Sequence, residues 1–168
     1  MTAPPSSLFG VTKAYAISMA VLPLSAVLAY LPDVYGNVVY LTEWVNYDSL
    51  QPRNNMLLLE SSNAPAPVKQ AYGRCKACHQ NNLETFPFFA SGLLASLFLG
   101  VDSRTTDTLS AGWLVSRLVY TLSYVKGTST TAATVRNLSW TASMGCAATL
   151  MLLALRSALA VVDRPSRY

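Results

Sequence analysis

Charged residues are scarce in this chain of 168 residues. Asp, Glu, Lys and Arg together make up 12% of it, whereas about 25% is usual in soluble domains. Hydrophobic residues make up 52%. So few charges leave too little polar surface to cover a globule that faces water on all sides. The composition therefore indicates a protein that lies in a membrane.

Basic clusters, cysteines and histidines are scarce as well. The net charge is +4, without a block of Lys and Arg or a basic stripe with interleaved aromatics, so we expect no nucleic-acid partner. Three cysteines do not make a disulfide framework. His79 is the only histidine, and a zinc site needs more Cys or His ligands than the chain offers. We therefore expect no metal.

The hydrophobic residues fall into four apolar segments, at residues 14–32, 85–101, 107–126 and 137–155. A membrane core of roughly 30 Å needs about 20 apolar residues in a helix. The first and fourth segments meet that length outright, and the other two meet it if their polar groups find partners. One alternative for the first segment is a cleavable signal peptide with Lys13 as its basic flank.

The connections between these segments predict the topology. Residues 33–68 form a long loop, whereas the later links are short, which implies antiparallel neighbours. We predict an all-α, integral membrane, up-down four-helix bundle in a single domain, 1–168. Residues 36–45 fit a short strand or a helical extension, and Pro65 or Pro67 opens the second helix. The predicted helices are 10–32, 67–100, 105–126 and 134–162.

A C-x-x-C-H string, Cys75 to His79, is typical of c-type haem attachment. Haem iron usually takes a second axial ligand, and a haem domain needs a soluble fold around the cofactor. Here an apolar segment begins directly after Glu84. We therefore expect no haem.

Helical geometry explains the same stretch better. Arg74, Asn81 and Glu84 fall within about 80° of one another on a helix, whereas His79 points away from them. Two polar faces on one membrane helix suggest one face toward its own bundle and one toward a neighbouring subunit.

The third and fourth segments add ionisable groups. Arg117, Tyr120 and Tyr124 form one helical stripe, and Arg136 stands at the head of the fourth segment. Ionisable residues inside a membrane are costly and tend to serve function. The structural alternative is a network in which Arg117 pairs with Glu84 and the tyrosines bond to carbonyl groups.

These residues resemble the pattern of the MAPEG family, membrane-associated proteins in eicosanoid and glutathione metabolism, as a divergent member. The matching residues are Arg74, Asn81, Glu84, Phe86 and Pro87 on the second helix, Arg117, Tyr120 and Tyr124 on the third, Arg136 on the fourth, and Pro52-Arg53 in the first loop.

The resemblance implies a homotrimer with glutathione bound between subunits, and His79 falls where some members place a Gln that reaches a neighbour's ligand. It implies a glutathione-dependent transferase or isomerase that acts on a lipophilic small molecule from the surrounding lipids. It also implies a multi-pass protein, in the endoplasmic reticulum membrane if eukaryotic. The expected catalytic residues are Arg136, Tyr120 and Glu84, and the expected glutathione-binding residues are Arg53, Arg74, His79, Asn81, Glu84, Arg117, Tyr120 and Tyr124.

Three departures separate the chain from the enzymes that use glutathione. Ala77 stands where they carry a second Arg, Thr85 replaces an aromatic, and the link from Tyr124 to Arg136 is longer. Two alternatives therefore stay open. The same fold could catalyse a thiol-independent isomerisation or cyclisation of a lipophilic metabolite, or it could be a non-catalytic lipid-binding protein.

Overall fold

The computed structural model describes residues 15–162, with side chains through residue 160. The expected beginning of the first helix at residue 10 and the chain after residue 162 lie outside this range. Within it the fold is all-α and has no strand. The helices are α1 (Ala16–Gly36), α2 (Asn55–Ser61), α3 (Ala66–Phe98), α4 (Ser103–Lys126) and α5 (Thr130–Val162), with a π-helical turn Asn37–Leu41 and a 3₁₀ turn Pro52–Asn54.

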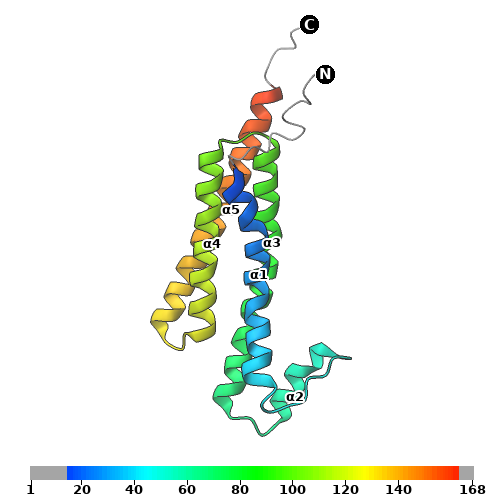
Figure 1. Cartoon of the computed structure of the whole chain (residues 1–168). Helices are drawn as coiled ribbons and strands as arrows, with labels where there is room; N and C mark the ends of the chain where they lie inside the picture. Colours follow the sequence, from blue (N-terminus) through cyan, green and yellow to red (C-terminus); the bar gives the residue numbers. More distant parts are fainter. Residues whose placement is uncertain (1–14, 163–168) are drawn as a thin grey trace.

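Four long helices lie side by side and alternate in direction (Figure 1). The α1 helix packs against α3 and α4, and α5 packs against the same two helices. The pair α3–α4 therefore forms the centre of the molecule, with α1 and α5 as its flanks. The short α2 lies at one end, beside the beginning of α3.

The helix ends follow local chemistry. Pro65 is the N-cap of α3, where a missing backbone N–H costs nothing. Asp102 caps α4 by accepting bonds from the backbone N–H and hydroxyl of Thr105, both at 2.9 Å. These bonds, that from the backbone N–H foremost, lower the pKa of the Asp102 carboxyl. The N-cap residue of α1, Tyr15, makes no side-chain hydrogen bond to the helix end; instead Asp107 of α4 accepts from the backbone N–H of Ser18 at 2.9 Å and from its hydroxyl.

The first helix extends further than the apolar pattern predicts. We expected it to end at residue 32, but α1 runs through Pro32 to Gly36 and continues as the π-helical turn. The reason is that Asp33, which ends the apolar run, forms an ion pair with Lys76 of α3 at 2.5 Å. Because the charge is compensated within the protein, the chain stays helical beyond it.

The core lies between the central pair and the flanks. Phe89 of α3 stacks on Trp113 of α4, with ring centroids 4.4 Å apart and an interplanar angle of 5°. Ser96 of α3 donates to the carbonyl of Leu150 at 3.0 Å, which draws α5 against α3. The side chains that build this core are Tyr15, Val21, Phe89, Leu93, Leu97, Trp113, Ala147 and Leu150.

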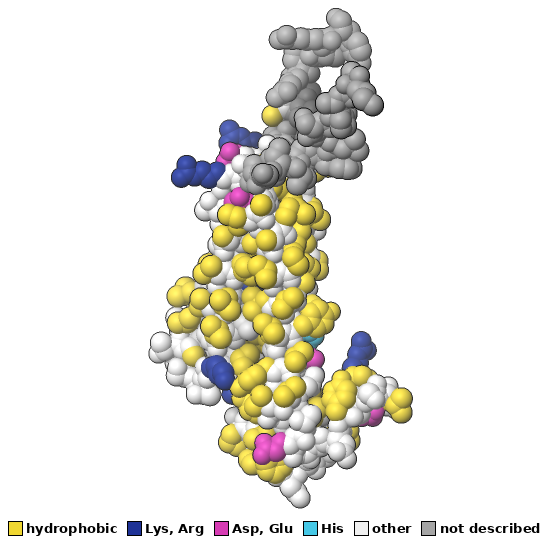
Figure 2. All heavy atoms as spheres, viewed as in Figure 1, with side chains coloured by type: hydrophobic (Ala, Val, Ile, Leu, Met, Phe, Trp, Pro, Cys, Tyr) yellow, Lys and Arg dark blue, Asp and Glu magenta, His cyan; other side chains and the backbone are white. Residues whose placement is uncertain are grey.

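The outer surface of the long helices is apolar over most of its length. Figure 2 shows hydrophobic side chains gathered over the middle of the molecule and charged side chains toward its two ends. On α1 the exposed residues Leu24, Val27, Leu31 and Val34 follow one helical face. Two stretches, Ala16–Leu41 and Thr130–Ala160, are long and apolar enough to cross a membrane. A surface of this kind suits contact with lipid or with another subunit.

Candidate functional site

A hollow of about 260 Å³ opens between α3, α4 and α5. We call it the arginine–tyrosine hollow, and its lining residues are Asn81, Tyr120, Tyr124, Arg136, Asn137, Trp140 and Thr141. Four of these, Asn81, Tyr120, Tyr124 and Arg136, are residues that the sequence pattern selected. Helices adjacent in space thus bring together side chains that are up to 55 positions apart in the chain (81 to 136).

The cations and aromatic rings of this region form a continuous ladder. The guanidinium of Arg136 lies 4.5 Å from the ring centroid of Tyr124, and Tyr124 meets Tyr120 edge to face at 5.4 Å. On the other side of Tyr120, the guanidinium of Arg117 lies 4.3 Å from the ring. Stacking of this kind fixes the guanidinium planes, so the ladder presents Arg136 to the hollow in a defined position.

The hollow carries positive charge without a compensating acid. Among residues 15–160, the structure pairs just one cation with a carboxylate, Lys76 with Asp33. Arg136 therefore has no carboxylate partner in the described part of the chain. Among the residues that the structure describes, no Asp or Glu lines the hollow. An anion is the ligand that this arrangement suits, since a guanidinium binds carboxylates with two parallel bonds.

Arg117 lies behind the hollow and does not line it. Its side chain is 3% exposed and donates from Nη2 to the backbone oxygen and Oδ1 of Asn81, both at 3.3 Å, and to Oδ1 of Asn82. Arg117 thereby positions Asn81, whose side chain reaches the hollow. No ion pair joins Arg117 to Glu84 within the described residues.

A second hollow of about 560 Å³ lies on a different face, between the end of α1, the 3₁₀ turn and α3. We call it the histidine hollow, and its lining residues are Asp33, Tyr47, Pro52, Arg53, Met56, Lys76, His79, Gln80 and Leu83. It contains two more of the predicted residues, Arg53 and His79. Those two therefore do not join the residues of the arginine–tyrosine hollow within one chain.

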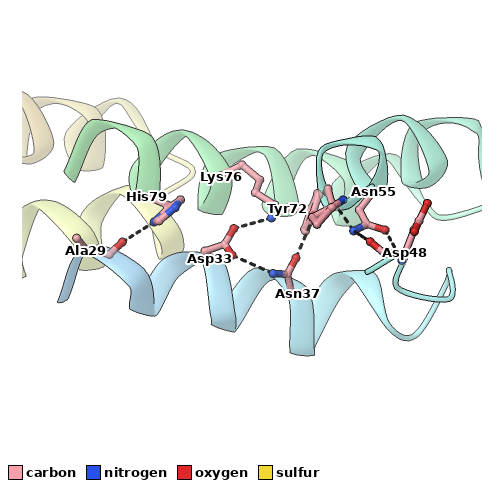
Figure 3. A network of polar contacts seen from close by, with 9 residues as sticks. Ala29, Asp33, Asn37, Asp48, Asn55, Tyr72, Lys76 and His79 are labelled. Atoms are coloured by element: carbon pink, nitrogen blue, oxygen red, sulfur yellow. Dashed lines mark hydrogen bonds and ion pairs between the residues drawn. The ribbon is translucent and has the colours of Figure 1, made fainter. Parts of the chain in front are cut away.

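Polar contacts hold the histidine hollow together (Figure 3). Nδ1 of His79 lies 2.8 Å from the carbonyl oxygen of Ala29, and Asp33 binds Lys76 and accepts from Asn37 at 3.0 Å. The hydroxyl of Tyr72 donates to Asn37, also at 3.0 Å. This chain of contacts joins α1 to α3 and fixes the orientation of the His79 ring.

The remaining predicted residues lie outside both linings. Arg74 is two helical turns before Asn81, half-buried, with its Nε atom buried and without a hydrogen-bond partner among the described residues. Glu84 is exposed and accepts from Gln80 at 2.9 Å. Ala77 is exposed on the same helix. The outward position of Glu84 leaves its carboxylate open to a neighbouring molecule.

The two thiols of the C-x-x-C-H string are packed between helices. Cys75 and Cys78 are both 0% exposed and belong to a cluster with Tyr120 and Val125. Gly36 of α1 lies so close that a Cβ atom there would come within 2.8 Å of the Cys75 Cβ. Within the described residues, no group of three or more His, Cys, Asp or Glu side chains is placed to hold a metal ion.

Comparison with known families decides the relationship. The MAPEG family model matches residues 14–156, which includes all four long helices up to Arg156 and both hollows. The chain belongs to the MAPEG family. No curated protein matches it. Membership, together with the two long apolar helices, indicates a membrane protein with a glutathione-related function of the transferase or isomerase type.

Several side chains at the two MAPEG hollows were missed by sequence reasoning. Asn137, Trp140 and Thr141 line the arginine–tyrosine hollow, and Lys76 and Asp33 line the other. Of the first three, Trp140 was within reach of prediction, because position i+4 from Arg136 lies on the same face of a helix. The Asp33–Lys76 pair carries no such signal, since it joins residues 43 positions apart.

Proposed function

We propose that this MAPEG protein is an integral, multi-pass membrane enzyme of the glutathione-dependent transferase or isomerase type. It acts on a lipophilic small molecule, in the endoplasmic reticulum membrane if the source is eukaryotic. The observation that carries the proposal is the arginine–tyrosine hollow, in which a stacked Arg136 faces a site without acidic residues. Glutathione is an anion with two carboxylates and a thiol, and this hollow suits such a ligand.

The chemistry assigns roles to the lining residues. Arg136 stabilises the thiolate of glutathione, because a nearby guanidinium lowers the pKa of a thiol. The amide nitrogen of Asn81 donates no hydrogen bond within the described residues and is available to a ligand carbonyl or carboxylate. The thiolate sulfur then forms a bond to an electrophilic carbon of the substrate, while the bond from that carbon to its leaving group, such as a halide or an epoxide oxygen, breaks. Tyr120 supplies the proton that a departing or newly formed oxyanion takes up.

A site shared by two subunits accounts for the distribution of the predicted residues. One chain places Asn81 and Arg136 in one hollow and His79 and Arg53 in the other. A single small ligand reaches both sets if the arginine–tyrosine hollow of one subunit faces the histidine hollow of the next. Exposed Glu84 and half-buried Arg74 then lie near the junction. We propose a homotrimer assembled in this way, in accordance with the family resemblance.

All four long helices cross the membrane in this proposal, as an up-down bundle. The α3 and α4 helices carry polar side chains that turn inward: Arg117 bonds to Asn81 and Asn82, and Asn82 donates to Thr121 at 3.2 Å. Polar side chains that face the bundle interior and bond to one another are tolerated inside a bilayer.

The test is glutathione binding by the purified protein, with conjugation of 1-chloro-2,4-dinitrobenzene as the activity. Arg136→Gln removes the charge that holds the thiolate, so we expect affinity and rate to fall about tenfold or more. Arg104→Gln is the matched control, because Arg104 is exposed near the beginning of α4, whereas the hollow lies near the end of that helix. We expect it to behave as the unaltered protein.

Two other outcomes would replace this proposal. Failure to bind glutathione at millimolar concentration, with activity that needs no thiol and is lost in Glu84→Gln, would favour a thiol-independent isomerisation or cyclisation. A purified trimer that carries lipid and turns over no electrophile would indicate a non-catalytic lipid-binding protein. Ala77 is exposed at the position where related enzymes carry an Arg. Because that Arg is missing here, the experiment has to distinguish these alternatives from glutathione chemistry.

A further inference from the structure

A small cavity lies between α1, α3 and α4, apart from both hollows. Its volume is about 10 Å³, and its walls are Ser25, Leu28, Asn82, Phe86, Trp113 and Arg117. A volume of this size holds one water-sized particle. The stacked rings of Trp113 and Phe89 form part of its rigid surroundings.

Three polar groups on the walls of this cavity have no partner. The Nη1 atom of Arg117, the Nε1 atom of Trp113 and the hydroxyl of Ser25 are buried without a hydrogen bond within the described residues. Their side chains are 3%, 1% and 6% exposed. The guanidinium and indole nitrogens can only donate, and a serine hydroxyl can donate as well. The cavity is therefore surrounded by hydrogen-bond donors.

The charge of Arg117 is uncompensated at the same place. A guanidinium stays protonated in proteins, and a buried charge needs a counter-charge or a full set of hydrogen bonds. Arg117 bonds only to neutral oxygens of Asn81 and Asn82, and in the described part of the chain it has no carboxylate partner. The faces of Trp113 and Tyr120, 5.6 and 4.3 Å from its carbon, supply part of the missing negative potential.

We propose that this cavity binds a single monoatomic anion, chloride under ordinary conditions. The ion accepts hydrogen bonds from Arg117, Trp113 and Ser25 and neutralises the buried guanidinium. The cavity has no room for sulfate, phosphate or a carboxylate; chloride is larger than a water molecule, so its entry requires the cavity walls to move apart slightly. The ion thereby fastens α1, through Ser25, to α4 directly behind the arginine–tyrosine hollow. A water molecule is the competing occupant, but it would satisfy donors without compensating the charge.

The test measures the thermal unfolding midpoint of the full chain in a neutral detergent. Sodium chloride and sodium bromide are compared with sodium gluconate and sodium sulfate at equal ionic strength. We expect a saturable rise in the midpoint with chloride or bromide alone, as for any ligand that binds only the folded state. Arg117→Met abolishes the rise, and Trp113→Phe, which removes one donor, weakens the apparent affinity roughly tenfold. Arg104→Gln, a charge change on the same helix away from the cavity, leaves the rise intact.

Equal midpoints in chloride and gluconate would overturn the proposal, as would a full chloride response in either Trp113→Phe or Arg117→Met. Trp113→Phe keeps an aromatic ring at this position and leaves the charge of Arg117 in place. It therefore decides the matter even where Arg117→Met does not fold. Crystals grown in sodium bromide give a direct answer. We expect an anomalous scattering peak within hydrogen-bonding distance of Arg117, and an ordered water without anomalous signal would refute the anion. None of these measurements depends on glutathione.

Discussion

Lys76 and Asp33 form the single ion pair between residues 15 and 160, and the pair joins α1 to α3. Their side chains are 30% and 25% exposed, so solvent screens the pair only in part. We expect Lys76→Met to lower the free energy of unfolding by about 2 kcal/mol, because it removes a charged hydrogen bond from a half-buried carboxylate. Chemical denaturation in detergent measures the change.

A double-mutant cycle identifies the source of that loss. In an Asp33→Asn background the carboxylate charge is absent, so Lys76→Met should cost much less than in the unaltered chain. Equal costs in both backgrounds would mean that the Lys76 ammonium acts through another contact, for instance the ring of Tyr72, whose centroid lies 5.1 Å from the ammonium nitrogen.

Single residues also show how far the sequence alone could reach. Spacing placed Tyr120 and Tyr124 on one helical face, and both line the arginine–tyrosine hollow. Spacing could not show that Arg117, on the same stripe, points inward to Asn82. The rotation of a helix about its axis, and which neighbour it meets, depend on side-chain packing between helices that are distant in sequence.

At the scale of elements, the apolar segments predicted the positions of the long helices, while the region between the first two was predicted poorly. Residues 33–68 looked like one long loop, yet they contain the end of α1, the π-helical turn and α2. The α2 helix is held by Leu59, which is 0% exposed in a cluster with Leu41 and Tyr72. A helix of seven residues is stable only through such packing, and periodicity cannot reveal it.

The contact of α3 with α5 depends on a small residue at its closest point. A Cβ atom on Gly92 would lie 3.0 Å from the Cγ of Met151 and 3.1 Å from the carbonyl oxygen of Ala147. We expect Gly92→Val to lower the free energy of unfolding by about 1–3 kcal/mol, the usual cost of overpacking. Thermal unfolding measures it. Gly145→Val is the matched control, since a Cβ there meets nothing within 4 Å; equal losses in both variants would show that overpacking at the contact of α3 with α5 is not responsible.

At the scale of the whole molecule, two hollows of different character open on different faces of one chain. The arginine–tyrosine hollow offers Arg136 and aromatic rings, and the histidine hollow offers His79, Lys76 and Arg53. A head-to-tail ring of identical subunits brings unlike faces together at every interface. In the proposed trimer each site therefore takes one half from each of two subunits. A site is active when the two halves that meet at its interface are both intact.

This shared site predicts complementation between inactive variants. Arg136→Gln damages one half of the site and His79→Ala the other, so each homotrimer should conjugate glutathione poorly. In mixed trimers formed from equal amounts of both variants, an intact site arises where an undamaged arginine–tyrosine hollow meets an undamaged histidine hollow. With random assembly this occurs at about one interface in four, so co-expression should restore about a quarter of the activity.

Mixing the two purified homotrimers without subunit exchange is the control and should restore none. Activity of the co-expressed pair that stays at the level of the single variants would show that each site is built within one chain, and would end the inter-subunit assignment of His79.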